Sequence, residues 1–112
     1  MWHPARALAK AVYDVTARFP AAHRYGIATQ LQRAALSVPA NISEGAKRES
    51  AAEFARFLNI AEASLAEVQY LLLMSREMAL GPADRIAELE ADAAMLARRL
   101  HALKVVVRRQ AA

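Results

Sequence analysis

The stretch that decides the fold is SAAEFARFLNIAEASLAEVQYLLLMSREM, residues 50–78. Its apolar residues recur at alternating spacings of four and three, the period of a helix that buries one face. They are Phe54, Leu58, Ala61, Leu65, Val68 and Leu72. A second apolar line lies beside the first and comprises Phe57, Ile60, Leu71, Met74 and Met78. A helix that is apolar over so wide an arc is expected to pack against more than one neighbour.

Capping and breaking residues place this helix among three others. Ser50 and Glu53 form a capping box at its start. Apolar stripes of the same period predict one helix between Pro4 and Pro20, one from Ile27 to a stop at Gly45, and one from Gly81–Pro82 to Val107. With short connections and no strand pattern, residues 1–112 are predicted to form a single domain, an all-α, antiparallel, up-down-up-down four-helix bundle.

Composition narrows the class of protein further. The 112 residues are 56% hydrophobic and contain no cysteine, which excludes disulfides, thiolate metal sites and cysteine nucleophiles. The N-terminal MWHPARALAK has no apolar core of signal-peptide length, and no uninterrupted apolar run reaches the roughly 18 residues of a membrane span. We therefore expect a soluble, cytoplasmic protein with no membrane contact.

The second helix carries an unusual polar stripe. Polar side chains recur along it at spacings of three or four, at Gln30, Arg33, Ser37, Asn41 and Glu44, and Pro39 lies within the same turns. A proline inside a helix removes a backbone hydrogen bond and crowds the preceding turn, at about 3 kcal/mol. A kink or break is therefore expected near residues 37–39.

Two interpretations of the stripe remain open. In one, Ser37 or Asn41 satisfies the backbone near Pro39, while Arg33 and Glu44 are solvated. In the other, the stripe faces a second subunit, where satisfied polar groups set register and partner choice. The surplus apolar surface predicted for the third helix favours the subunit interface.

The stretches FPAAHRYGIATQLQRAALSVPANISEGAKRES and EFARFLNIAEASLAEVQYLL resemble a family of four-helix bundles encoded in intervening sequences of the 23S ribosomal RNA gene. The most specific matching residues are Gln30, Arg33, Ala34, Ser37, Pro39, Asn41, Glu44 and Gly45. Supporting matches are Leu58, Ala61, Ser64, Leu65 and Glu67. Two positions depart from the family pattern: His23 replaces an acidic residue and Ala63 a glycine.

The resemblance implies an antiparallel bundle that assembles into a ring of five copies, with no defined catalytic activity. The chain is also similar, more weakly, to accessory proteins of diversity-generating retroelements, which are basic pentameric bundles that work with a reverse transcriptase and nucleic acid. The expected partners are therefore further copies of the chain and, as an alternative function, RNA or DNA. The resemblance specifies no heterologous protein partner.

The sequence contains no arrangement typical of an enzyme or a metal site. It has no Glu-x-x-His pair, no H-E-x-x-H, no phosphate-binding glycine loop and no G-x-S-x-G. We expect no catalytic residues, no metal and no cofactor. Glu62 and Glu67 are expected to pair with arginines such as Arg33.

The end of the last helix is strongly basic. Arg98, His101, Lys104, Arg108 and Arg109 are predicted to form one face turned away from the apolar stripe. Such a face could contact phosphates through backbone-directed, weakly sequence-specific binding. The alternative is that bases at the end and acids at the start of this helix complement its dipole and aid solubility.

Overall fold

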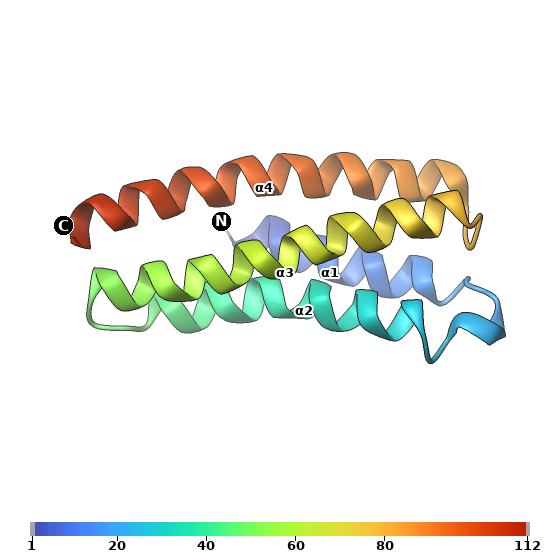
Figure 1. Cartoon of the computed structure of the whole chain (residues 1–112), viewed down its shortest axis with the longest axis horizontal. Coiled ribbons are helices and arrows are strands. Elements are labelled where there is room, and N and C mark those ends of the chain that lie inside the picture. Colours follow the sequence, from blue (N-terminus) through green and yellow to red (C-terminus); the bar gives the residue numbers. More distant parts are fainter. Residues whose placement is uncertain (1, 112) are drawn as a thin grey trace.

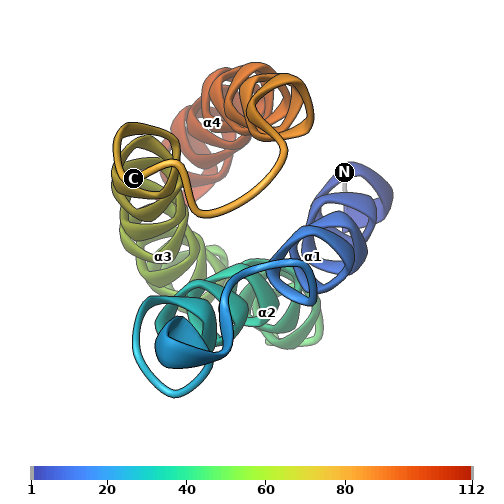
Figure 2. The same cartoon turned by 90° about the vertical axis from the view of Figure 1, so that its right-hand side faces the viewer.

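The computed structural model describes residues 2–111, which form four long helices without a strand. The elements are α1 (Trp2–Thr16), the short 3-10 turn η1 (Ala21–His23), α2 (Ile27–Ala46), α3 (Ala51–Glu77) and α4 (Ala83–Ala111). Successive helices run in opposite directions (Figure 1) and occupy four corners when viewed end-on (Figure 2). The predicted all-α antiparallel four-helix bundle is confirmed.

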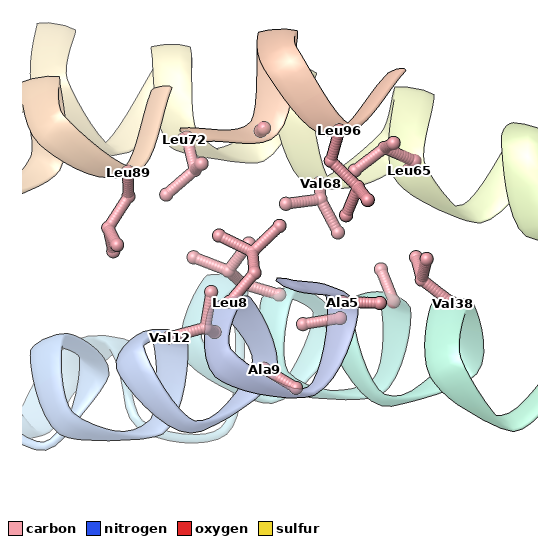
Figure 3. Packing of buried hydrophobic residues seen from close by; sticks show 14 of the residues in the cluster. Ala5, Leu8, Ala9, Val12, Val38, Leu65, Val68, Leu72, Leu89 and Leu96 are labelled. Carbon is pink, nitrogen blue, oxygen red and sulfur yellow. The ribbon is translucent and has the colours of Figure 1, made fainter. Parts of the chain in front are cut away.

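The core lies between the four helices and is built from the predicted stripes. Side chains of α1 and α2 point toward those of α3 and α4, as Leu8, Val38, Val68 and Leu96 illustrate (Figure 3). The α3 stripe is deeply buried after its half-buried first residue Phe54, since Leu58, Ala61, Val68 and Leu72 are all 0% exposed.

The helices differ greatly in length, and this divides the bundle into two halves. α1 has 15 residues, whereas α3 has 27 and α4 has 29. α1 therefore covers only the half next to the α3–α4 turn (Figure 1). The other half contains α2, α3 and α4, and at its end the α2–α3 link lies beside the C-terminal turns of α4.

The N-terminus of α3 lies where the capping residues predicted it, whereas the C-terminus ends at Glu77, before the predicted stop at Gly81–Pro82. The Ser50 side chain accepts a hydrogen bond from the Glu53 backbone N–H at 3.1 Å, as the capping box predicted. At the C-terminus Ala79, with φ 53°, takes the left-handed conformation usually given to glycine, and the Leu80 N–H donates to the Ser75 carbonyl at 3.0 Å. Gly81 instead lies against the Phe19 ring, where a Cβ would approach to 3.1 Å.

Pro39 lies inside α2 without interrupting it, so the expected break at residues 37–39 is wrong. The neighbouring Val38 and Ile42 are 1% and 0% exposed. Burying such side chains contributes about 1.5–3 kcal/mol each, which together offsets the roughly 3 kcal/mol cost of the proline. Tertiary packing therefore keeps the helix continuous.

Gly45 does not stop α2, contrary to the sequence prediction. It is buried within the last turn, and its φ is not positive. A Cβ at this position would lie 2.6 Å from Phe57 Cβ and 3.0 Å from Phe54 Cδ1. Gly45 is therefore the point at which α2 approaches α3 too closely for any side chain.

Replacing Gly45 by alanine is expected to destabilise the fold. Overpacking costs about 1–3 kcal/mol, which exceeds the gain of up to about 1 kcal/mol in helix propensity. Urea denaturation should therefore give a lower free energy of unfolding for Gly45→Ala. The control is Ser43→Ala on the exposed face of the same helix, expected within about 0.5 kcal/mol of wild type. A Gly45→Ala variant more stable than wild type would contradict the close approach.

Candidate functional site

The seam between α2 and α3 holds the middle of the predicted polar stripe. Asn41 Nδ2 donates to the Ser37 carbonyl at 2.8 Å and to Ser37 Oγ at 2.9 Å. Ser37 Oγ lies 2.7 Å from Ser64 Oγ on α3. Ser37 thus joins α2 to α3, and Asn41 supports it from within α2. Ser64, which the resemblance included, completes this chain of hydrogen bonds.

The remaining stripe residues divide between two places. Gln30 and Arg33 are exposed and line a hollow of about 380 Å³ in the seam, with Ser37, Ser64 and Glu67. Glu44 lies nearer the end of α2, where it faces Arg48 at 3.7 Å. The predicted stripe is therefore not one continuous surface.

Opposite charges border this hollow without joining. Arg33 comes from α2 and Glu67 from α3, and no ion pair links them within residues 2–111. The prediction that Glu62 and Glu67 pair with arginines such as Arg33 is wrong, because Glu62 faces Lys104 and His101 on α4 and Glu67 forms no ion pair among the described residues. An exposed arginine and an exposed glutamate thus remain available to a partner beside the hollow.

Pro39 lies on the other side of α2 from the stripe, facing α1. It lines a second hollow, of about 450 Å³, between the two helices. The other lining residues are Arg6, Ala9, Lys10, Tyr13, Asp14 and Leu36. Tyr13 and Leu36 are 42% and 48% exposed. The hollow therefore presents apolar side chains to solvent, and the charged Arg6, Lys10 and Asp14 lie around them.

The predicted basic face of α4 is split by the burial of Lys104. This residue is 8% exposed, donates to the Glu62 carboxylate, and lies 3.3 Å from Asn59 Oδ1. Position 104 is four residues after Leu100 and three before Val107, so it lies on the buried side of α4. His101 also turns to Glu62, with Nδ1 2.9 Å from Oε2. Assigning Lys104 to the outward face was wrong.

Glu62 thereby bridges two bases on α4. Burial raises the pKa of its carboxyl, but the hydrogen bonds and charges of Lys104 and His101 outweigh this, and the pKa lies below its usual 4.5. The carboxylate is therefore ionised at neutral pH and ties α3 to α4. The hydrogen bonds of Glu62, Lys104 and His101 are made among these three side chains and Asn59.

Arg56 of α3 lies beside Arg108 of α4 at this end of the bundle. A hollow of about 270 Å³ is lined by Ala52, Ala55, Arg56, Asn59, Lys104 and Arg108. Arg56 also lies over the Phe57 ring, with Cζ 4.7 Å from the ring centroid, and Arg48 lies 4.8 Å from it. Nothing in the sequence pattern pointed to Arg56, because only the packing of α3 on α4 brings it beside Arg108.

The other predicted basic residues lie outside this hollow. Arg98 and Arg109 are exposed on α4. Of the five residues assigned to the basic face, Lys104 and Arg108 share the hollow, and His101 is engaged with Glu62. Among residues 2–111, no group of three or more His, Cys, Asp or Glu side chains could hold a metal ion.

The helix α3 carries apolar side chains outside its buried stripe. It is the one helix in the described chain that is long and apolar enough to cross a membrane by length and composition alone, a test that the core helix of a soluble protein also passes. Only 39% of its most apolar 18-residue window is buried within the chain. Ile60 and Tyr70 are 39% and 59% exposed.

Comparison with known proteins identifies the family. The profile of the 23S rRNA-intervening sequence proteins matches residues 1–102. The chain belongs to this family. In this intervening-sequence protein the matched region contains all residues of the α2–α3 seam and of the α1–α2 hollow, whereas Lys104, Arg108 and Arg109 lie beyond it. A search of curated proteins finds no match.

Replacing Glu62 by glutamine should test the α3–α4 bridge. The variant leaves the buried Lys104 ammonium without its carboxylate, which should lower the free energy of unfolding at pH 7 by about 1–3 kcal/mol. Because the folded-state pKa of Glu62 is depressed, its contribution is complete above 4.5 and is lost as the pH falls through the lowered value. The difference between wild type and Glu62→Gln should therefore shrink in acid.

The measurement is urea denaturation across the pH range, with the exposed Glu49→Gln as the matched control. That control should differ from wild type by less than about 0.5 kcal/mol at every pH. A stability gap for Glu62→Gln that stayed constant into acid would contradict the bridge.

Proposed function

We propose that this intervening-sequence protein is a non-enzymatic assembly module that acts as a homo-oligomer. The observation that carries the proposal is the exposed apolar surface of α3. Ile60 and Tyr70 on this helix are 39% and 59% exposed, whereas Leu58, Ala61, Leu65, Val68 and Leu72 of its inner stripe are buried. Exposed apolar surface of this kind, bordered by polar residues, marks interaction sites.

The polar seam beside α3 supports the same proposal. Gln30, Arg33 and Glu67 line the seam hollow. Glu67 follows Ile60 by seven residues and precedes Tyr70 by three, so these three exposed residues share one side of α3. Aromatic and aliphatic side chains beside polar groups are typical of interfaces. The Ser37–Ser64 hydrogen bond joins α2 to α3 beneath this surface, and a surface set within one chain loses less entropy on binding. The resemblance of the chain to pentameric bundles makes a ring of five copies the proposed assembly.

The absence of a catalytic role is part of the proposal and is supported by how Glu62 is used. Its carboxylate is occupied by Lys104 and His101, so its contacts serve the joining of α3 to α4. Arg33 and Glu67 are exposed to solvent, where a general acid or base gains little from its surroundings.

Light scattering coupled to size-exclusion chromatography tests the assembly. Wild type is expected to have a mass near five chains. Ile60→Asp places a charge on the exposed side of α3 and should raise the concentration at which the oligomer dissociates by at least about tenfold, while circular dichroism stays helical. Val106→Asp on α4, where the residue is 50% exposed, is the matched control and should assemble like wild type. A monomeric wild type would overturn the proposal.

A second candidate function is nucleic-acid binding, and the grouping of basic side chains at the α3–α4 end favours it. Arg56 and Arg108 line one hollow with Lys104, and Arg109 is exposed close by. Arginine side chains form bidentate hydrogen bonds to phosphate oxygens. Since Lys104 is paired with Glu62, and Arg56 Nε lies 2.9 Å from Glu53 Oε2, the exposed Arg108 and Arg109 would supply the contacts. The protein would then contact the backbone with little sequence preference.

Replacing Arg108 and Arg109 together by glutamine tests this candidate. The double variant should bind single-stranded RNA at least about tenfold more weakly at low salt. The slope of log K against log salt should fall by about 0.7 for each phosphate that the variant no longer neutralises. Fluorescence anisotropy with Arg24→Gln, an exposed position on the α1–α2 connection, gives the control. Unchanged affinity and slope would exclude this end of the bundle as the binding surface.

A further inference from the structure

The hollow at the α3–α4 end of the bundle is lined by basic and amide side chains and by two alanines. It lies where the first turns of α3 run beside the last turns of α4 (Figure 1). Its lining residues are Ala52, Ala55, Arg56, Asn59, Lys104 and Arg108. Its volume of about 270 Å³ is below the roughly 300–1,000 Å³ of pockets that hold drug-sized ligands, so it suits a ligand of a few atoms.

The charges that line this hollow are all of one sign, unlike those of neighbouring hollows. No carboxylate is among its lining residues in the part of the chain that the structure describes. The α1–α2 hollow contains Asp14, the α2–α3 hollow contains Glu67, and a hollow of about 320 Å³ between α1 and α4 contains Asp92. An anionic ligand would meet an acid in those three places, whereas here it would meet bases and an amide.

Arg56 is held in place by contacts outside the hollow. Its Nε donates to Glu53 Oε2 at 2.9 Å, and its Cζ lies 4.7 Å from the Phe57 ring centroid. The pairing with Glu53 uses one of the five N–H groups of the guanidinium, and the four on Nη1 and Nη2 have no partner in the described residues. The guanidinium is therefore oriented before a ligand arrives, which lowers the entropic cost of binding.

Lys104 and Asn59 supply further donors to the hollow. The Lys104 ammonium has three N–H groups, of which the Glu62 carboxylate and Asn59 Oδ1 accept two. Because Asn59 accepts through its oxygen, its side-chain N–H groups remain for a different acceptor, and none is found among residues 2–111. Each of the two residues thus keeps an N–H donor beside the Arg56 guanidinium.

Arg108 supplies the net positive charge of the hollow. Three positive charges line it, and Glu53 and Glu62 outside it offset those of Arg56 and Lys104. Arg108 pairs with no acid among residues 2–111. It comes from α4 and Arg56 from α3, so two guanidiniums can bind different oxygens of one anion.

We propose that this hollow binds a single phosphate group, either inorganic phosphate or the terminal phosphate of a larger molecule. A tetrahedral oxyanion accepts the charge-assisted hydrogen bonds that the two guanidiniums offer, and the donors of Lys104 and Asn59 complete its coordination. The inference goes beyond the nucleic-acid candidate. A strand that passes over this end of the bundle meets the exposed Arg108 and Arg109, whereas a small group can reach the inner donors.

Isothermal titration calorimetry with inorganic phosphate at constant ionic strength tests the site. Wild type should bind one phosphate per chain with a dissociation constant below about 1 mM. Arg56→Gln and Arg108→Gln should each raise this constant by at least about tenfold, the loss expected for a hydrogen bond between charged groups. Arg108→Lys, which keeps the charge without the planar fork, should lose less. Circular dichroism melts check that each variant is folded.

Arg109→Gln is the matched control, because it removes the same charge one residue away and outside the hollow. It should change the dissociation constant for phosphate by less than about threefold, since exposed charges are screened at this ionic strength. A loss as large as that of Arg108→Gln would show a diffuse basic surface and overturn the proposal. Wild type that shows no saturable binding up to about 10 mM phosphate, well above the expected constant, would overturn it too.

A second arm distinguishes the two sources of the phosphate. A short RNA with a 5′-phosphate and the same RNA with a 5′-hydroxyl are compared by fluorescence anisotropy. A preference of at least about tenfold for the 5′-phosphate, lost in Arg56→Gln, assigns the site to the end of a strand. Equal affinities, with binding of inorganic phosphate intact, assign it to the free anion.

Failure of this inference is distinguishable from failure of the proposed functions. A monomeric wild type would overturn the assembly and leave the phosphate site standing. A wild type that binds RNA through Arg108 and Arg109 but takes up no phosphate would overturn the phosphate site alone.

Discussion

Burial of the α3 stripe is the constraint on which the rest of the structure depends. Leu58, Ala61, Val68 and Leu72 are inaccessible to solvent, and this requires a neighbouring helix on each side of α3 along its length. α2 and α4 fill these places, and the short α1 closes one half of the bundle. The same helix is apolar beyond its stripe, so the packing that completes the core leaves apolar surface outside it.

The position of α2 follows from that constraint and explains its unusual sequence. It packs on α1 along one side and α3 along the other, and its buried side chains keep it continuous through Pro39. Ser37 Oγ meets Ser64 Oγ across the seam and accepts from the Asn41 amide within α2, while Gly45 allows α2 to lie close against Phe54 and Phe57 of α3. Pro39 and Gly45 disfavour a helix locally, but α2 is continuous because the free energy gained by burying its apolar side chains exceeds their cost.

At the α3–α4 end, some charged side chains are held by partners within the chain, and others are exposed without such a partner in the described residues. Lys104, His101 and Glu62 satisfy one another's charges and hydrogen bonds, and the pKa of Glu62 is lowered as a result. Arg108 and Arg109 have no such partner among residues 2–111. Charges that look equivalent along α4 therefore differ in what they can offer to a ligand.

The sequence by itself determined the four helices, the order in which they pack and the capping of α3 by Ser50, because apolar period and capping residues act within a few turns of the chain. The inward position of Lys104 was also readable, since it lies one helical turn from Leu100 and Val107. Only the tertiary structure decided what crosses between helices: the Ser37–Ser64 hydrogen bond, the meeting of Arg56 with Arg108, and the separation of Pro39 from the polar stripe. These depend on the rotation and closeness of neighbouring helices, which side-chain packing sets and no local pattern encodes.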